Sequence, residues 1–144
     1  MRGGFLLIET RADQPNLVRV FGTETESEPK PAFPQQDDRP RLRYCAYFHD
    51  LDAALMHTHE PLKRRLVDVD KGLYRIDPLE AVAAAQSVDL RHWQTYIDAE
   101  IADDPRLAES VTSKLRRKQR FQLLWNIVGV IAIVLLLLKL LLGM

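Results

Sequence analysis

Cysteine is almost absent from the sequence: Cys45 is the only one among 144 residues. A disulfide within the chain is therefore impossible, and a zinc or iron–sulfur site built from several thiolates of one chain is excluded. Both exclusions fit a reducing compartment such as the cytosol. Length and composition also argue against a two-domain enzyme, a disulfide scaffold and long Pro-rich disorder, which leaves one small domain and one membrane segment.

Acidic residues are missing from the end of the sequence, although the formal net charge of the whole chain is zero. Residues 114–144 carry six basic side chains and no acid, whereas residues 1–113 carry 14 basic and 20 acidic ones. Five of the six basic residues lie directly before an apolar run: Lys114, Arg116, Arg117, Lys118 and Arg120. Such a cluster tends to stay on the cytoplasmic side of a membrane and attracts anionic lipid headgroups, by roughly 1 kcal/mol per residue. Because headgroups explain the cluster and the rest of the chain is acidic, we do not expect binding to nucleic acid.

Charge of either sign is missing from residues 121–138, a run of 18. Continued past Lys139 to Leu142, the run forms a helix of about 33 Å, which is long enough to cross a hydrocarbon core. Lys139 can extend its ammonium group to the far headgroups, and Trp125 suits the interface at the entry side. A helix in the membrane plane is disfavoured because residues 127–138 have no polar face. We therefore predict a single spanning helix over residues 121–142.

The start of the sequence offers no export signal, since the apolar stretch Phe5–Ile8 ends after four residues at Glu9. We therefore expect a tail-anchored protein whose N-terminal domain lies in the cytoplasm. Arginine outnumbers lysine by 14 to 6. Together with many Ala, Leu and Asp residues, this usage resembles that of a GC-rich bacterial genome and favours an inner membrane.

Residues 1–104 predict an α+β domain with a small, mainly antiparallel sheet and one or two packed helices. Gly4–Thr10 and Leu17–Gly22 read as a β-hairpin with a turn at residues 12–16, and Leu42–Phe48 is the clearest strand. Asp50 can cap a helix whose apolar face is spaced by 3.6 residues, and which Pro61 either kinks or restarts. That face consists of Leu51, Ala54, Leu55, Thr58 and Leu62.

The second half of the domain alternates between strand and helix signals. Residues 67–76 favour a hairpin around Gly72 over the competing reading, a continuous helix. Asp77-Pro78 begins an Ala-rich helix to Val88 that we expect to pack closely on the sheet, and His92–Ile97 is a final strand. Pro105 begins a helix that we expect to run without a break into the membrane, with residues 105–120 as its basic juxtamembrane part. Its stripe of Leu107, Val111 and Leu115 should contact either the domain or a partner.

Residues 23–41 are rich in proline and acid and hold only Ala32 and Phe33 as apolar residues. Such a segment buries too little to offset its ordering entropy, so we predict a long mobile loop. Phe33 could anchor a docking segment there, but a plain connector is the favoured reading.

Catalytic signals are weak. His57 and His59 could chelate a metal on a strand, but on the expected helix their rings point apart, so they stay weak candidates. Asp68 and Asp70 could bind a cation or do acid–base chemistry, although the solvent face of a hairpin explains them. Cys45 could be a nucleophile with His49 or His57 as its base, but a buried strand position is the commoner role. No serine elbow, phosphate loop or metalloprotease pair is present, and we expect no cofactor.

Four residues line one face of the predicted membrane helix, spaced by four, three and four residues: Gln122, Asn126, Gly129 and Ile133. Asn126 can hydrogen-bond across a helix interface and Gly129 allows close approach, although the two polar side chains could instead reach the interface. We therefore expect a non-catalytic accessory or assembly subunit of a membrane complex, whose helix packs on an integral membrane partner or on itself. The alternatives are a membrane-tethered regulator that binds a ligand or a soluble protein, and a small enzyme using Cys45 or His57 and His59.

Overall fold

The computed structural model of the chain describes residues 2–11, 13–24, 40–141 and 143, without the side chain of Lys118. Two compact units make up the chain, residues 1–111 and residues 112–144. Residues 25–39, and with them Phe33 and most of the predicted mobile loop, lie outside the described residues.

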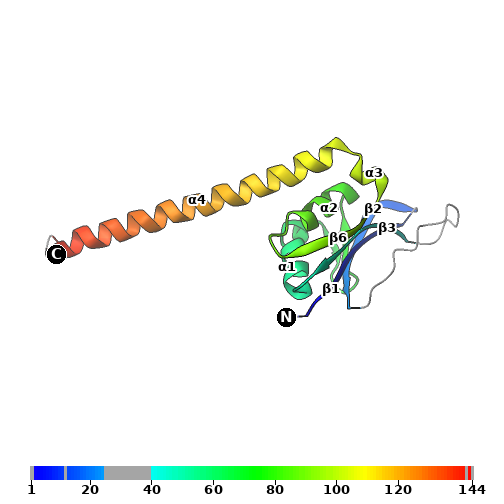
Figure 1. Ribbon diagram of the computed structural model, residues 1–144, viewed down its shortest axis with the longest axis horizontal. Helices are drawn as coiled ribbons and strands as arrows, with labels where there is room; N and C mark the ends of the chain where they lie inside the picture. Colours follow the sequence, from blue (N-terminus) through cyan, green and yellow to red (C-terminus); the bar gives the residue numbers. More distant parts are fainter. Residues whose placement is uncertain (1, 12, 25–39, 142, 144) are drawn as a thin grey trace. The chain divides into compact units, whose positions relative to one another are not determined.

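The first unit is built on an antiparallel sheet with helices packed against it (Figure 1). The sheet has six strands in the order β4-β5-β2-β1-β3-β6. Its strands are β1 (Gly4–Arg11), β2 (Gln14–Thr23), β3 (Arg41–Phe48), β4 (Leu66–Asp68), β5 (Leu73–Arg75) and β6 (His92–Ile97). The α+β class and the antiparallel sheet are thus confirmed, as are the first hairpin and the strands at 42–48 and 92–97. The first turn is shorter than predicted, because β2 already begins at Gln14.

Two capped helices pack on the sheet. The side chain of Asp50 accepts a hydrogen bond from the Ala53 N–H, and α1 (Leu51–Leu62) follows. The helix runs through Pro61 and gives way to the 3-10 helix η1 (Lys63–Arg65). Asp77 caps α2 (Pro78–Gln86) by accepting from the Leu79 N–H, as predicted, although α2 ends two residues before the expected Val88. Both caps satisfy backbone donors that the first helical turn leaves without a partner.

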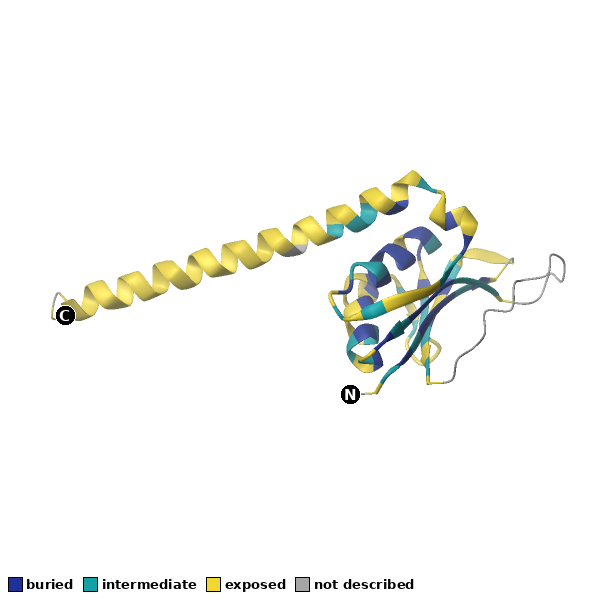
Figure 2. Cartoon of the chain, in the orientation of Figure 1, coloured by how far each residue is buried: buried dark blue, intermediate teal, exposed yellow. Residues whose placement is uncertain are grey.

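The hydrophobic core lies between these helices and one face of the sheet (Figure 2). The predicted face of α1 is buried at Leu51, Ala54, Thr58 and Leu62, and Leu55 packs beside it. In α2 every residue from Ala81 to Ala85 is buried. Because four of these five residues are alanines, the backbone of α2 can approach the sheet closely, which confirms the expected tight packing.

The second hairpin decides an alternative that the sequence left open. β4 and β5 pair antiparallel, so the continuous helix through Gly72 is wrong. Gly72 has φ of 61° and its carbonyl accepts from the Val20 N–H at 2.9 Å. Glycine adopts this left-handed conformation without strain. A continuous helix through Gly72 would need the right-handed conformation here and could not contain this turn.

The chain leaves β6 through a short helix that the sequence analysis missed. This helix, α3 (Ala99–Ala102), is capped by Asp98 and is followed by α4 (Pro105–Leu141). The start of α4 is as predicted, and the Asp104 side chain accepts from the Arg106 N–H at 2.9 Å. Leu107 is buried and Val111 is partly buried against the core. Of the two roles expected for the stripe, contact with its own domain is therefore what the structure shows for these two residues.

One buried polar atom stands out in the core. Tyr44 is fully buried, and among the described residues its hydroxyl has no hydrogen-bond partner. Burial raises the pKa of this hydroxyl well above its usual value. A buried polar group without a partner loses its hydrogen bonds to water on folding and forms no hydrogen bond within the protein, so it destabilises the folded state.

We expect Tyr44→Phe to raise the free energy of unfolding by about 1 kcal/mol, because it removes an unsatisfied hydroxyl and preserves the ring. Urea unfolding of the full chain in mild detergent, followed by Trp93 fluorescence in a Trp125→Phe background, measures the change. Tyr74→Phe is the matched control: its hydroxyl lies 2.8 Å from His59 Nδ1, so the same substitution should be destabilising. A loss of stability in Tyr44→Phe would mean that its hydroxyl has a partner.

Candidate functional site

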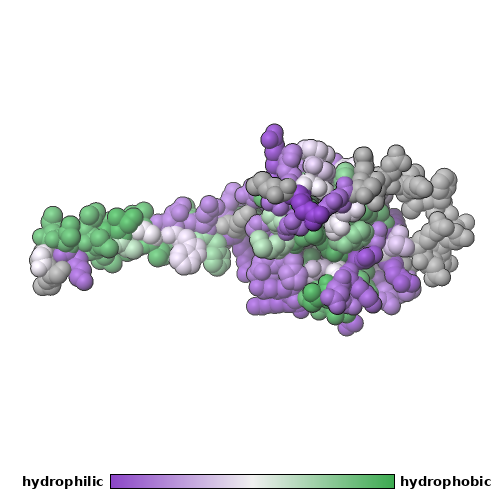
Figure 3. Space-filling model, turned by 90° about the horizontal axis from the view of Figure 1, so that it is seen from below, coloured by the Kyte–Doolittle hydropathy of each residue, from purple (hydrophilic) through white to green (hydrophobic). Residues whose placement is uncertain are grey.

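The C-terminal helix is the first candidate site. Among the described residues, α4 is the one helix long and apolar enough to cross a membrane, consistent with a single-pass membrane protein. Figure 3 shows hydrophobic residues gathered along its C-terminal part and hydrophilic residues along the part before it. Gln122, Asn126, Gly129 and Ile133 are all exposed. A Cβ added at Gly129 would meet no atom within 4 Å, so this face is open to an approaching helix.

The basic cluster precedes this apolar part on the same helix. Arg116, Arg117 and Arg120 are exposed, and Lys114 is half-buried. The side chain of Lys118 lies outside the described residues. Leu115 is 40% exposed. Near the other end, Lys139 belongs to the last turn of α4, where a cation also interacts favourably with the helix dipole.

The sheet face opposite α1 and α2 is the second candidate site. Since Tyr44, Ala46 and Phe48 face the core, alternation turns Cys45 and Tyr47 to the other face. Tyr47 stacks on Trp93 of β6 with ring centroids 4.6 Å apart, and Phe5 and His49 meet the Tyr47 ring edge-on. Trp93 is 54% exposed. These four rings form an aromatic shelf at the β6 edge of the sheet: Phe5, Tyr47, His49 and Trp93.

Cys45 lies deep in this face, between Leu7 of β1 and Tyr96 of β6 in the strand register. It is fully buried. A thiol in such surroundings acts as a small apolar residue, and solvent does not reach it. This position agrees with the structural role that the sequence analysis favoured for Cys45.

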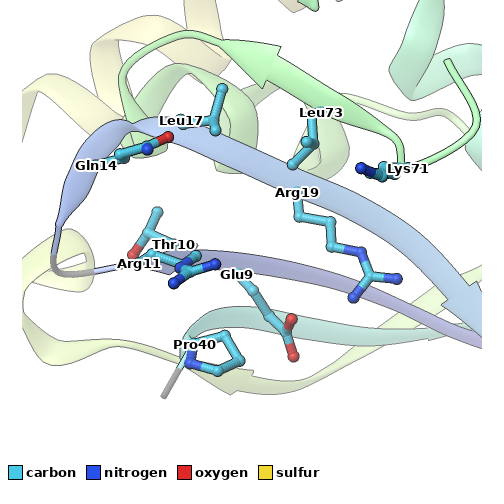
Figure 4. A pocket seen from close by; sticks show the side chains of 9 residues that line it. All are labelled: Glu9, Thr10, Arg11, Gln14, Leu17, Arg19, Pro40, Lys71 and Leu73. Atoms are coloured by element: carbon cyan, nitrogen blue, oxygen red, sulfur yellow. The ribbon is translucent and has the colours of Figure 1, made fainter. Parts of the chain in front are cut away.

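A hollow of about 610 Å³ lies at the β5 side of the same face (Figure 4). Its lining combines three cations with one acid and several apolar side chains: Glu9, Thr10, Arg11, Gln14, Leu17, Arg19, Pro40, Lys71 and Leu73. The Arg19 guanidinium carbon lies over the Phe21 ring, 4.5 Å from its centroid, in a cation–π contact. Burial raises the pKa of Glu9, and the nearby charge of Arg19 acts in the opposite direction. Of the basic residues here, Arg11 already pairs with Asp13 and Lys71 lies 3.8 Å from Asp68.

A polar cluster joins β3 to the start of α3. The buried Asp98 carboxylate accepts from Arg41 Nη2 and from Arg43 Nη1, both at 3.0 Å. It also accepts from the Glu100 N–H at 3.2 Å. Glu100 accepts from both arginines as well, and these hydrogen bonds lower its pKa. The cluster fastens the start of α3, the segment before α4, to the sheet. It was not predicted from the sequence because the arginines and their acidic partners are 55 to 59 residues apart.

The histidines and the other acids stay apart. His57 and His59 both lie on α1; His57 is exposed, whereas His59 Nδ1 is 2.8 Å from the Tyr74 hydroxyl. Asp68 ends β4 and accepts from the Lys71 N–H within the turn, and Asp70 is exposed in that turn. Among the described residues, no three His, Cys, Asp or Glu side chains gather as a metal site would require. The structure thus does not bring Cys45, His57 and His59 into one site.

Comparison with known proteins gives no further assignment: the chain matches no protein-family model, no curated protein and no solved structure. Any function therefore has to be argued from these sites alone.

Proposed function

We propose that the chain is a non-catalytic accessory or assembly subunit of a membrane protein complex, anchored by α4, with its N-terminal domain in the cytoplasm of a bacterial cell. The observation that carries the proposal is the face of Gln122, Asn126 and Gly129 on the apolar part of α4. A polar amide facing lipid is costly, and a partner helix offers it a hydrogen bond. Gly129, with open space around its Cβ position, lets that helix approach closely.

Three further features support an anchored, non-catalytic role. A single spanning helix has no transport path of its own, so it needs other helices to take part in transport. The basic cluster before the apolar part, in turn, suits a cytoplasmic membrane surface with anionic lipids. The buried Cys45 and the separated histidines give little basis for a catalytic centre in the described part of the chain.

Asn126→Leu combined with Gly129→Leu should release the chain from its complex without expelling it from the membrane. The two leucines remove the hydrogen bond and block close approach, while they keep the helix apolar. The measurement is purification of the tagged chain from native membranes in mild detergent, with mass spectrometry of stoichiometric partners. Membrane fractionation checks that the variant is still inserted.

Val128→Leu combined with Ile131→Leu is the matched control, because it adds two leucines with the same spacing on another side of α4. The proposal predicts that this control keeps the partner. If the Asn126/Gly129 variant co-migrates with the partner unchanged, the packing face is refuted. Tagging two copies differently in one cell tells whether the released neighbour is another protein or a second copy.

A membrane-tethered regulator is the second candidate, and the hollow at Arg19 favours it. Its size falls within the range of small-molecule sites, and Arg19 offers N–H donors beside the apolar Leu17 and Leu73. A chain that leaves the membrane alone in the same purification would support this second function over the first.

A further inference from the structure

The two edges of the sheet differ in how they are protected. Edge strands expose unpaired backbone N–H and C=O groups, and proteins commonly shield them by shortness, charge, proline or a bulge. β4 has three residues and is surrounded by charge, from Arg64 and Arg65 before it to Asp68, Asp70 and Lys71 around its turn. β6 has twice that length, with the sequence His-Trp-Gln-Thr-Tyr-Ile, and contains no Asp, Glu, Lys, Arg, Pro or Gly. Its one irregularity in the pairing with β3 is a bulge at Thr95.

β6 also exposes side chains that suit a protein contact. Among the described strands only β3 pairs with it, so its outer backbone groups face outward. Trp93 is 54% exposed, and Gln94 and Thr95 are exposed as well. Thr95 is a bulge residue, with no residue of β3 opposite it in the register. Trp93 pairs with Tyr47, and Tyr96 pairs with Cys45. Trp93 and Tyr96 therefore both lie on the sheet face that the helices do not cover. An uncharged, six-residue edge beside an aromatic shelf is a template for another strand.

We propose that β6 pairs antiparallel with β6 of a second copy, joining the two sheets into one. Self-pairing fits because no charge on β6 would face a like charge on its twin. The largest number of pairs forms when the two-fold axis passes between Gln94 and Thr95. In that register Trp93 of each copy lies opposite Tyr96 of the other, and aromatic pairs of this kind stabilise antiparallel strands.

The assembly closes at two copies. A two-fold contact uses the same edge on both chains, and the remaining outer edges are the short, charged β4 strands. A membrane anchor would favour this pairing because copies confined to one membrane meet at a high effective concentration. The proposal does not depend on what the Asn126 face of α4 binds, since it concerns the first unit alone.

Cysteine cross-linking in the full chain tests the pairing. Thr95→Cys places two thiols beside the two-fold axis, within the Cα separation that a disulfide spans. Met56→Cys is the control, on the exposed side of α1, and the wild-type chain reports on the buried Cys45. In lipid nanodiscs or sparse liposomes under mild oxidation, Thr95→Cys should form a disulfide dimer about tenfold faster than Met56→Cys. Equal rates would reflect collision only and would overturn the proposal.

Charge substitution separates pairing of β6 from association through α4. Thr95→Lys puts two like charges across the axis, and Thr95→Glu does the same with the opposite sign. Each variant alone should stay folded but should not pair through β6, whereas a mixture of the two should recover dimers, seen by energy transfer between labels at Met56→Cys. Dimers in the Lys variant that persist when Asn126→Leu and Gly129→Leu are also present, or no recovery in the mixture, would refute the pairing. So would a Thr95→Cys chain that cross-links only to another protein.

Discussion

Asp98→Ala should lower the free energy of unfolding of the first unit by about 3 kcal/mol, the largest loss we expect from a single side chain here. Asp98 is almost fully buried and binds two guanidinium groups, while its N-cap bond to the Glu100 N–H begins α3. Arg43 is only 14% exposed, so it would keep a desolvated charge with Glu100 as its remaining acidic partner. Removing one member of a buried pair is costly for that reason, whatever the pair contributed by itself.

Two variants make this expectation specific. Asp13→Ala breaks an ion pair of the same chemistry at the surface, where Arg11 and Asp13 are about half exposed, and should change stability by less than about 0.5 kcal/mol. Asp98→Asn keeps an acceptor for the cap but removes the charge. Its loss in the free energy of unfolding should lie between those of Asp98→Ala and Asp13→Ala. Denaturant unfolding of the full chain in mild detergent, with Trp93 as the probe, gives all three values. If Asp98→Ala matched Asp13→Ala, the cluster would not hold α3 to the sheet.

The sequence predicted the parts of the fold that depend on neighbours along the chain. Caps such as Asp50 and Asp77 act within three residues, and the turn at Gly72 needs one left-handed position, so local chemistry identifies them. The apolar face of α1 was predicted because 3.6-residue periodicity reports which side is buried. The long apolar part of α4, a candidate membrane span, was predicted from composition alone, since an 18-residue run without charge is the pattern of such a span.

The parts that sequence reasoning missed depend on residues that only the fold brings together. Arg41 and Arg43 precede Asp98 by more than fifty residues, and each looks like an ordinary surface charge in the sequence. The aromatic shelf needs the pairing of β3 with β6 to place Tyr47 on Trp93. Even α3 escaped notice, because its four residues are too few to show a helical period.

We expect Gly72→Ala to lower the free energy of unfolding by about 3 kcal/mol, the second large effect. This substitution tests whether the β4–β5 hairpin depends on the close approach of Gly72 to β2. The left-handed φ of Gly72 strains any residue with a Cβ. In addition, a Cβ at this position would overlap the backbone carbonyl oxygen of Val20, which is fixed in the sheet. Relief requires the turn to move away from β2, and the hydrogen bond from Val20 N–H to the Gly72 carbonyl would then weaken.

Gly72→Asn separates the two causes, because asparagine tolerates the left-handed region better than alanine but brings the same Cβ. We expect Gly72→Asn to recover only part of the loss, since the overlap with Val20 remains. Lys71→Ala, one residue earlier in the same turn, should be nearly neutral because its side chain is exposed and its ion pair with Asp68 is long. Full recovery in Gly72→Asn would assign the whole cost to backbone conformation, whereas a neutral Gly72→Ala would contradict the close approach of the hairpin to β2.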